Sequence, residues 1–248
     1  YQVVRYSIAN LMAGNGVLLK HAESVTGSAL ELQRIYREAG LPEHLFTVLV
    51  IDHDQSDAVI AHDKVRGVTL TGSPSAGRII GEQAGKALKK TVLELGSNDA
   101  YLVLEDADLD RAVQMCVMGR GYNNGETCGA AKRFIVTEKN YDAFVKGYAA
   151  AFKDVAMGDP NENDTQLGPL VSCSQRDQIH KQVEESVSKG AKIVAGGEIP
   201  DRTGWFYPAT ALVDVAPGQP AYDDEIFGPV ASIIKATDDE DAMRIAND

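Results

Sequence analysis

Short apolar segments alternate with longer amphipathic segments from one end of this chain to the other, and this alternation restricts the fold more than any other feature. The short segments are rich in Val, Ile and Leu, which favours strands, whereas the longer ones carry apolar residues at helical spacing. Alternating strands and helices are typical of the α/β class with a parallel sheet. Because the strands of the first half are almost continuously apolar, we expect their sheet to be buried on both faces.

The alternation falls into two series of elements. The first has expected strands at residues 16–20, 46–51, 67–71 and 90–95, with helices at 24–39 and 75–88 and a short helix capped by Ser56. The second has expected strands at 100–104, 133–137, 191–195, 209–215 and 230–236, with helices at 108–119, 141–155 and 174–189. The first series has the pattern of a nucleotide-binding sheet, so we predict two domains, residues 1–92 and residues 93–248.

Charge and hydropathy exclude several classes of function. The 248 residues carry 24 Lys+Arg against 36 Asp+Glu, a net charge of −12, and no basic run that could contact phosphates, so we expect no nucleic-acid partner. No apolar stretch approaches the roughly 20 residues that a membrane span requires, and no signal peptide is visible. Three cysteines without metal-ligand spacing indicate a reducing compartment. We therefore expect a cytoplasmic protein without a metal site.

Both ends of the chain have the appearance of cut ends. The first residue is Tyr1 rather than Met, and the sequence begins within a helical pattern. Residues 238–248 form a capped amphipathic pattern that stops just after its apolar Ile245 and Ala246. We expect the chain to be part of a longer protein.

Two segments of the first series have residue types suited to a dinucleotide. Gly72, Ser73 and Gly77 lie between an expected strand and helix, where glycines permit close approach and a helix N-terminus offers N–H groups to a phosphate. Lys20 and Glu23 follow the first strand, where a lysine can donate to ribose hydroxyls and a glutamate can accept from a 2′-hydroxyl while repelling a 2′-phosphate. A structural turn and a solvated charge pair explain the same residues equally simply.

Glu94 is the candidate general base. It stands between Leu93 and Leu95 in an apolar strand and is followed by Gly96. Desolvation at such a position would disfavour the charged carboxylate, which is the tuning that a general base needs. The alternative is that strand alternation turns the side chain to solvent.

Cys128 is the candidate nucleophile among the three cysteines. It lies in a polar loop between Thr127 and Gly129, where a thiolate can be exposed beside backbone N–H groups. Cys116, by contrast, shares a helical face with apolar neighbours and is expected in the core. Cys173 follows a Gly-Pro loop, and its surroundings indicate neither a catalytic nor a core position. An inert loop thiol remains the alternative for Cys128.

In combination these segments resemble the aldehyde dehydrogenase superfamily. The resemblance rests on Glu94-Leu95-Gly96-Ser97, which is similar to its glutamate motif, and on Gly125-Glu126-Thr127-Cys128, which is similar to its cysteine motif. The further matches, in family order, are Lys20-x-x-Glu23, Gly72-Ser73-x-x-x-Gly77, Gly158-Asp159-Pro160, Leu167-Gly168-Pro169 and Glu225-Ile226-Phe227-Gly228-Pro229. The resemblance implies a Rossmann-type dinucleotide-binding domain followed by an α/β catalytic domain, each present in part.

The resemblance also implies an activity, the NAD(P)-dependent oxidation of an aldehyde to an acid. Cys128 would attack the carbonyl carbon, its backbone N–H and an asparagine would hold the oxyanion, and Glu94 would activate the water that hydrolyses the thioester. The cofactor contacts implied are Lys20, Glu23, Gly72, Ser73, Gly77, Leu95, Glu225 and Phe227. Glu23 favours NAD, with NADP possible, and the whole protein is expected to be a homodimer or homotetramer.

The chain departs from the family pattern at two places. Ser97 stands where the glutamate motif usually has its second glycine, and the Asn-Phe-Pro segment with the oxyanion asparagine would lie before Tyr1. Lys20-His21-Ala22 and residues 131–136 are most similar to bacterial succinate-semialdehyde dehydrogenases. Arg5 falls where that branch can place an arginine for the substrate carboxylate, although Tyr122 replaces a second arginine of some members. Another aliphatic or aromatic aldehyde, or a noncatalytic dinucleotide-binding relative, is the alternative.

Overall fold

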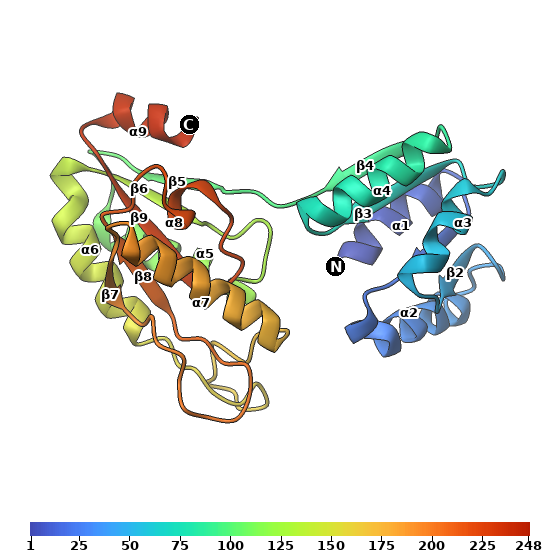
Figure 1. Ribbon diagram of the computed structural model, residues 1–248. Helices are drawn as coiled ribbons and strands as arrows, with labels where there is room; N and C mark the ends of the chain where they lie inside the picture. Colours follow the sequence, from blue (N-terminus) through green and yellow to red (C-terminus); the bar gives the residue numbers. More distant parts are fainter. The chain divides into compact units, whose positions relative to one another are not determined.

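The computed structural model describes residues 1–248, which divide into two compact units, Tyr1–Gly96 and Ser97–Asp248. Figure 1 shows both units. The division falls after Gly96 rather than after Val92, because β4 (Lys90–Glu94) pairs along its whole length with β3 (Gly67–Thr71). Residues 93–96 therefore belong with the first unit.

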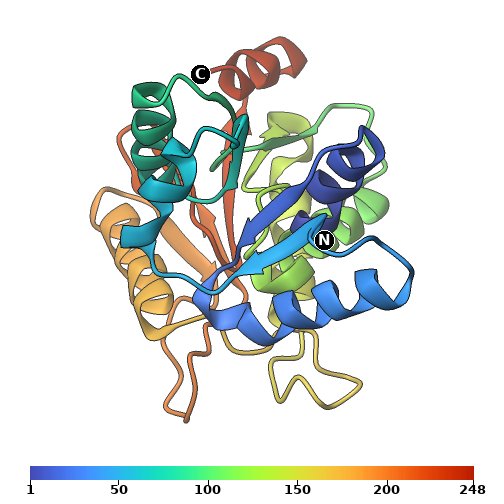
Figure 2. The ribbon, with the colours of Figure 1, turned by 90° about the vertical axis from the view of Figure 1, so that its right-hand side faces the viewer.

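The first unit has four strands in two separate parallel pairs. β1 (Val17–Lys20) and β2 (Phe46–Leu49) form one pair, seen side by side in Figure 2, and β3 and β4 form the other. The helices of this unit are α1 (Gln2–Met12), α2 (Thr26–Glu38), α3 (Ser56–Ala61) and α4 (Pro74–Lys86). Its small core consists of Val17, Leu19, Ala29 and Phe46, with partly buried residues of α1 and α2 packed against it.

The expectation that these strands are buried on both faces is wrong. All five residues of β4 are exposed, and β3 alternates between exposed and half-buried residues. Each strand of a two-stranded sheet is an edge strand, and α4 is the helix that contacts this pair most closely, with Gly81 lying against Leu93. The apolar character of β3 and β4 is therefore not matched by a second covering layer within the unit.

The second unit is a three-layer α/β/α structure around a five-stranded sheet of order β5-β6-β9-β8-β7. The strands are β5 (Ala100–Val103), β6 (Arg133–Thr137), β7 (Lys192–Ala195), β8 (Thr210–Val213) and β9 (Val230–Ala236), and only β7 runs antiparallel to its neighbour. The helices are α5 (Leu109–Gly121), α6 (Glu138–Lys153), α7 (Cys173–Ser188), α8 (Pro220–Asp223) and α9 (Asp239–Ala246).

Alternation along the central strand β6 assigns its side chains to two apolar cores. Phe134 and Val136 pack with α5 and α6, whereas Ile135 packs with α7, α8 and α9 on the other face. Every residue of β6 is buried. Strands covered on both faces are thus found in this unit rather than in the first, with helices on each side of the sheet in Figure 1.

Side-chain caps set where the helices begin. Ser73, Asp108, Ser172 and Asp238 each accept a hydrogen bond from a backbone N–H in the first turn of α4, α5, α7 and α9. The expected cap at Ser56 is wrong, because Asp52 caps a 3₁₀ turn, His53–Gln55, through a capping box, and α3 continues from that turn. None of the helices combines the length and the apolar character needed to cross a membrane.

Candidate active site

The residues expected to hold the cofactor ribose lie at the carboxyl end of the first parallel pair. Lys20 ends β1, and Glu23 begins the 3₁₀ turn Glu23–Val25. Side-chain ligand atoms of Glu23, Asp52 and His53 all lie within 4.8 Å of one another, and all three residues are exposed. Sequence reasoning missed Asp52 and His53. Their position a few residues after β2 was the available signal, since the carboxyl ends of paired parallel strands meet at one edge.

The turn between β3 and α4 contains residues that stabilise the start of the helix and a glycine, Gly72, that makes no close contact. The Ser73 hydroxyl accepts a hydrogen bond from the Ala76 N–H at 3.2 Å and lies 2.8 Å from the Ser75 hydroxyl. A Cβ at Gly77 would lie 2.6 Å from Leu95, so Gly77 lets α4 pack directly on the end of β4. A Cβ at Gly72 would make only ordinary contacts. A side chain at position 77 would therefore force the Leu95 side chain to shift, whereas one at position 72 would not.

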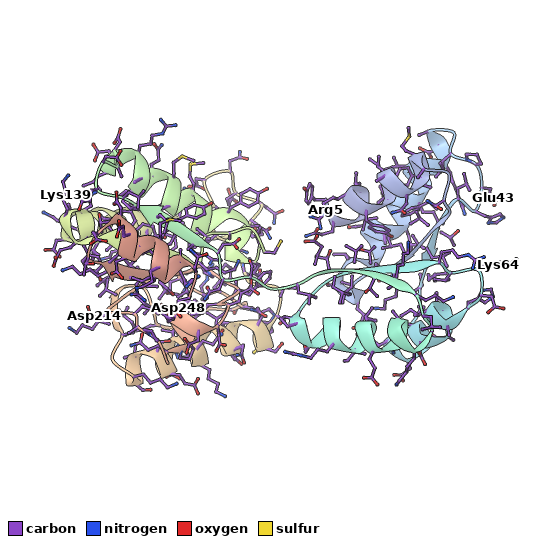
Figure 3. The ribbon with its side chains drawn as sticks, turned by 90° about the horizontal axis from the view of Figure 1, so that it is seen from above. Arg5, Glu43, Lys64, Lys139, Asp214 and Asp248 are labelled. Atoms are coloured by element: carbon purple, nitrogen blue, oxygen red, sulfur yellow. The ribbon has the colours of Figure 1, made fainter.

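Glu94 and Arg5 form an ion pair in the first unit. The Arg5 guanidinium, on α1 and labelled in Figure 3, lies 3.4 Å from the carboxylate of Glu94, and the two side chains are 43% and 48% exposed. The expected desolvation of Glu94 in apolar company is therefore wrong for this unit. An exposed pair of this kind contributes only about 0–1 kcal/mol, so a competing carboxylate can readily take the place of Glu94.

The turn that precedes Cys128 has a strained backbone. Asn123, Asn124 and Gly125 all have positive φ, at 50°, 58° and 70°. Strain of this kind costs on the order of 1 kcal/mol for each non-glycine residue and persists only where surrounding contacts hold it. A Cβ at Gly125 would lie 2.3 Å from the carbonyl oxygen of Gly228, so no side chain fits there.

Contacts from distant segments hold this turn in place. The Asn124 side chain accepts from the Gly168 N–H at 2.9 Å and donates to the Pro169 carbonyl at 3.1 Å. The Arg120 guanidinium, fully buried, donates to the Gly125 carbonyl at 2.5 Å, and burial lowers the pKa of Arg120 to about 10. Two motifs recognised separately in the sequence, residues 167–169 and 225–229, thus meet at the cysteine motif.

Glu126 is fixed in the same turn. Its carboxylate accepts a hydrogen bond from the Val171 N–H at 3.1 Å. Burial raises the pKa of Glu126, while that hydrogen bond acts in the opposite direction. The residues between Gly125 and Cys128 are therefore anchored by side-chain contacts as well as by their backbone.

Cys128 is half-buried, and its carbonyl oxygen is the centre of a polar cluster. The Ser97 hydroxyl donates to that oxygen at 3.0 Å, and the Lys132 ammonium donates to it at 2.6 Å. Ser97, expected only to be tolerated in place of glycine, thus makes a direct contact with the cysteine turn. Sequence reasoning missed Lys132, whose signal was a lysine directly before the fully buried strand β6.

Glu225 lies beside this cluster, and α7 holds the segment that carries it. One carboxylate oxygen of Glu225 is 3.2 Å from the Lys132 ammonium. Gln182 donates to the Glu225 carbonyl at 3.2 Å, and Gln175 donates to the Phe227 carbonyl at 2.8 Å. The second unit thus brings together Cys128 and Glu225, which the sequence had separately assigned to the site.

The other two cysteines differ from Cys128, and Cys116 does so as expected. Cys116 lies in the core, and burial raises the pKa of its thiol to about 12. Cys173 donates to the Asp177 carboxylate at 3.3 Å, and this hydrogen bond raises the pKa of the Cys173 thiol. Neither thiol is presented on a loop.

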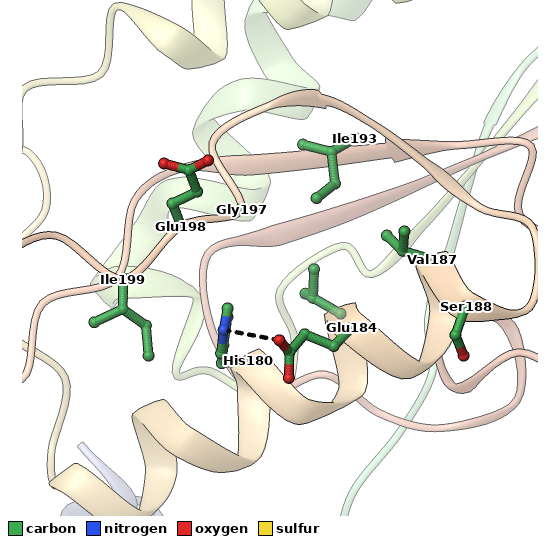
Figure 4. A pocket seen from close by; sticks show the side chains of 9 residues that line it. His180, Glu184, Val187, Ser188, Ile193, Gly197, Glu198 and Ile199 are labelled. Atoms are coloured by element: carbon green, nitrogen blue, oxygen red, sulfur yellow. Dashed lines mark ion pairs between the residues drawn. The ribbon is translucent and has the colours of Figure 1, made fainter.

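A separate open pocket lies between α7 and the β7 end of the sheet (Figure 4). Its volume is about 640 Å³, and its wall includes Val183, Ile193 and an ion pair of His180 with Glu184 at 3.5 Å. None of the candidate site residues lines it. The pocket is therefore not part of the candidate site.

Comparison with known proteins agrees with the motif order. The family described as "Aldehyde dehydrogenase family" matches residues 1–248. The chain belongs to the aldehyde dehydrogenase family.

Individual relatives within the aldehyde dehydrogenase family are similar over the whole chain. The NADP(+) succinate-semialdehyde dehydrogenase of Mycobacterium leprae (strain TN) is 45% identical over 247 residues, covering 100% of this chain and 54% of the relative. The NAD(P)+ succinate semialdehyde dehydrogenase of Escherichia coli (strain K12) is 44% identical over 248 residues, with the same coverage. The chain spans about half the length of these curated relatives.

A solved family structure has the same fold. The succinic semialdehyde dehydrogenase of Streptococcus pyogenes, in complex with NADP+, is 41% identical with a TM-score of 0.97, covering 100% of this chain and 55% of that chain. The α/β fold expected from the sequence is confirmed as the fold of the aldehyde dehydrogenase family.

Proposed function

We propose that the protein oxidises succinate semialdehyde to succinate with a nicotinamide dinucleotide as the oxidant. The observation that supports this most strongly is the cysteine turn, in which a half-buried thiol follows a strained backbone held by Asn124, Arg120 and Gly228. A turn fixed in this way suits a nucleophile that must meet a carbonyl carbon in one orientation. Relatives named for this substrate, at 44–45% identity, support the choice of aldehyde.

In the proposed reaction, Cys128 carries the substrate as a covalent intermediate. Its thiolate adds to the aldehyde carbon, and its backbone N–H donates to the oxyanion that forms. Collapse of the oxyanion expels hydride and leaves a thioester on Cys128. Glu94 then removes a proton from the water that attacks the thioester, and the Cys128 thiolate leaves as succinate forms. The bound dinucleotide supplies the hydride acceptor.

Glu225 has an acceptor that fits a dinucleotide hydroxyl. Its oxygen Oε1 is buried and accepts no hydrogen bond, although the Lys132 ammonium is 3.2 Å away. Buried acceptors of this kind are normally satisfied, so a donor from a bound group would complete the site. We assign Glu225 to a ribose hydroxyl and place Phe227 beside it.

Glu23 and Asp52 support NAD over NADP in the proposed function. Their carboxylates lie together at the end of the first parallel pair, with His53 beside them. Carboxylates accept hydrogen bonds from a ribose 2′-hydroxyl and repel a 2′-phosphate. The first unit is thus proposed as the part that selects the cofactor.

Replacing Glu23 with serine is expected to lower the ratio of kcat/KM with NAD to kcat/KM with NADP by about tenfold, since a charge-assisted hydrogen bond contributes about 1.5–3 kcal/mol. The measurement is the initial rate of NADH or NADPH formation by the complete gene product. Glu43→Ser, at an exposed glutamate of the same unit, is the matched control. An unchanged ratio in Glu23→Ser would remove Glu23 from cofactor selection.

Arg5 is proposed to bind the substrate carboxylate, because its guanidinium already holds a carboxylate through a weak, exposed contact with Glu94. Arg5→Gln is expected to lower kcat/KM for succinate semialdehyde by about 10- to 100-fold, from the loss of about 1.5–3 kcal/mol. With butanal, which lacks the carboxylate, we expect less than about a threefold change, since no charge-assisted bond is lost. Initial rates of NADH formation with both aldehydes provide the test.

Two outcomes of this experiment contradict different parts of the proposal. Equal losses on both aldehydes would exclude Arg5 as the carboxylate site. No turnover of any aldehyde by the complete, unsubstituted gene product would exclude the enzymatic function itself. Lys64→Gln, which removes a cation from a loop of the first unit labelled in Figure 3, is expected to leave both rates unchanged.

A further inference from the structure

Lys132 is a buried cation close to the candidate nucleophile that the proposed reaction does not use. Its side chain is 3% exposed, on the segment between Cys128 and β6. A buried ammonium is costly unless it is paired with a charge and its protons are bonded. The structure supplies both conditions.

The three protons of the Lys132 ammonium have three acceptors. They are the Cys128 carbonyl at 2.6 Å, the Ala130 carbonyl at 3.2 Å and the Ser97 hydroxyl at 3.3 Å. An ammonium has three donors and no acceptor, so these contacts use its full hydrogen-bonding capacity. The shortest of them ends on Cys128.

Glu225 supplies the charge that makes this buried cation stable. Its Oε1 lies 3.2 Å from the ammonium but accepts no hydrogen bond from it. The interaction between Lys132 and Glu225 is therefore coulombic. A change in the charge of Glu225 would act on the ammonium, and through it on the carbonyl of Cys128.

We propose that Lys132 is a positioning residue, whose ammonium joins the Glu225 carboxylate to the Cys128 carbonyl and thereby sets how the Cys128 thiol is presented. Ser97 takes part in the same set of contacts, since its hydroxyl donates to the Cys128 carbonyl and accepts from the Lys132 ammonium. The inference rests on the proposed function only in taking Cys128 as the reacting thiol. It predicts that Lys132 and Glu225 act on Cys128 as a unit, whereas two separate structural roles would act independently.

Alkylation by iodoacetamide tests the proposal without aldehyde or cofactor, so failure of the proposed function would leave the test intact. The rate at each cysteine is measured by peptide mass spectrometry on the complete gene product and its variants. Cys173, on the first turn of α7, serves as the internal reference, and the buried Cys116 reports unfolding because it reacts only when the core opens. A single sample thus gives the site, the reference and the state of the fold.

Lys132→Met is expected to slow labelling of Cys128 about tenfold, because the charge-assisted hydrogen bond that holds the Cys128 carbonyl is lost. Glu225→Gln is expected to slow it about threefold, since the ammonium loses its counter-charge. The double variant should match Lys132→Met, because Glu225 acts through the lysine. Lys139→Met, at a lysine that binds the Glu105 carbonyl on the surface of the same unit, should match the parent.

The proposal is overturned if Lys132→Met labels Cys128 at the parent rate or faster, or if the two substitutions add independently in the double variant. If Cys116 becomes reactive in Lys132→Met, the fold has opened, and Ser97→Gly decides instead. That variant removes one donor from the Cys128 carbonyl without burying an unpaired charge, and we expect labelling to slow about threefold. Labelling at the parent rate in Ser97→Gly would then overturn the proposal.

Discussion

Replacing Cys128 with alanine is expected to abolish aldehyde oxidation, with a loss of at least about 10,000-fold in kcat, the scale seen when a covalent nucleophile is removed. The reason is that no other thiol of the chain can replace it: Cys116 is buried in the core, and Cys173 is hydrogen-bonded to Asp177 at the start of a helix. The measurement is NADH formation from succinate semialdehyde by the complete gene product. Intact-protein mass spectrometry should also show that no covalent adduct forms.

Cys173→Ala is the matched control for this experiment. It removes a half-buried thiol from the same unit but leaves the cysteine turn unchanged, so we expect activity within about twofold of the parent, as for most substitutions outside a site. If Cys128→Ala retained turnover with Glu94 intact, aldehyde oxidation would have to proceed without a covalent intermediate. Cys128 would then lose its proposed role.

Replacing Glu94 with glutamine is expected to separate the two halves of the reaction. The thioester on Cys128 should still form, because acylation needs only the thiol, whereas its hydrolysis should slow by about 100- to 10,000-fold, the contribution of a general base. Rapid mixing should therefore show a burst of NADH close to one equivalent of enzyme, followed by almost no turnover. Mass spectrometry should detect the succinyl adduct on the Cys128 peptide.

Glu82→Gln provides the comparison for Glu94→Gln. Glu82 is an exposed glutamate of the same unit, paired with Lys86 at 2.7 Å, and its replacement should leave both the burst and the steady rate unchanged. Equal burst and turnover in Glu94→Gln and the parent would exclude Glu94 as the base. Loss of the burst would instead place Glu94 in the first half of the reaction.

The sequence predicted the regular elements of the second unit well, because local pattern and tertiary burial agree there. The strands at 133–137 and 230–236 begin and end as expected, since each is a run of apolar residues lying between helices on both faces. Cys116 was assigned to the core for the same reason. The spacing of apolar residues thus predicts burial correctly when the helices that should cover a strand are present in the same unit.

The apolar pattern predicted burial wrongly for β4, where no second layer covers the strand within the unit. The apolar residues of β4 suggested a covered strand and a desolvated Glu94, but β4 is exposed and Glu94 pairs with Arg5 from α1. The surroundings of β4 and Glu94 were not predictable, because which elements cover a strand is decided by packing between distant segments.

The polar cluster around Cys128 shows the same limit for individual contacts. Ser97, Lys132 and Glu225 are far apart in sequence. No local rule predicts that Ser97 and Lys132 bind the same carbonyl oxygen or that Glu225 pairs with Lys132. Ser97 looked like a neutral departure from glycine, and Lys132 had no assigned role. Side-chain contacts between segments become visible only when the chain is folded.

The strained turn before Cys128, residues 123–125, has a consequence for protein engineering, because neighbouring positions differ in whether they tolerate a new side chain. A side chain at Gly125 would collide with the Gly228 carbonyl, so libraries that vary position 125 would consist almost entirely of inactive clones. Tyr122, only three positions earlier, is 72% exposed. Directed evolution of substrate scope would therefore sample diversity at Tyr122 while leaving the geometry of the nucleophile intact.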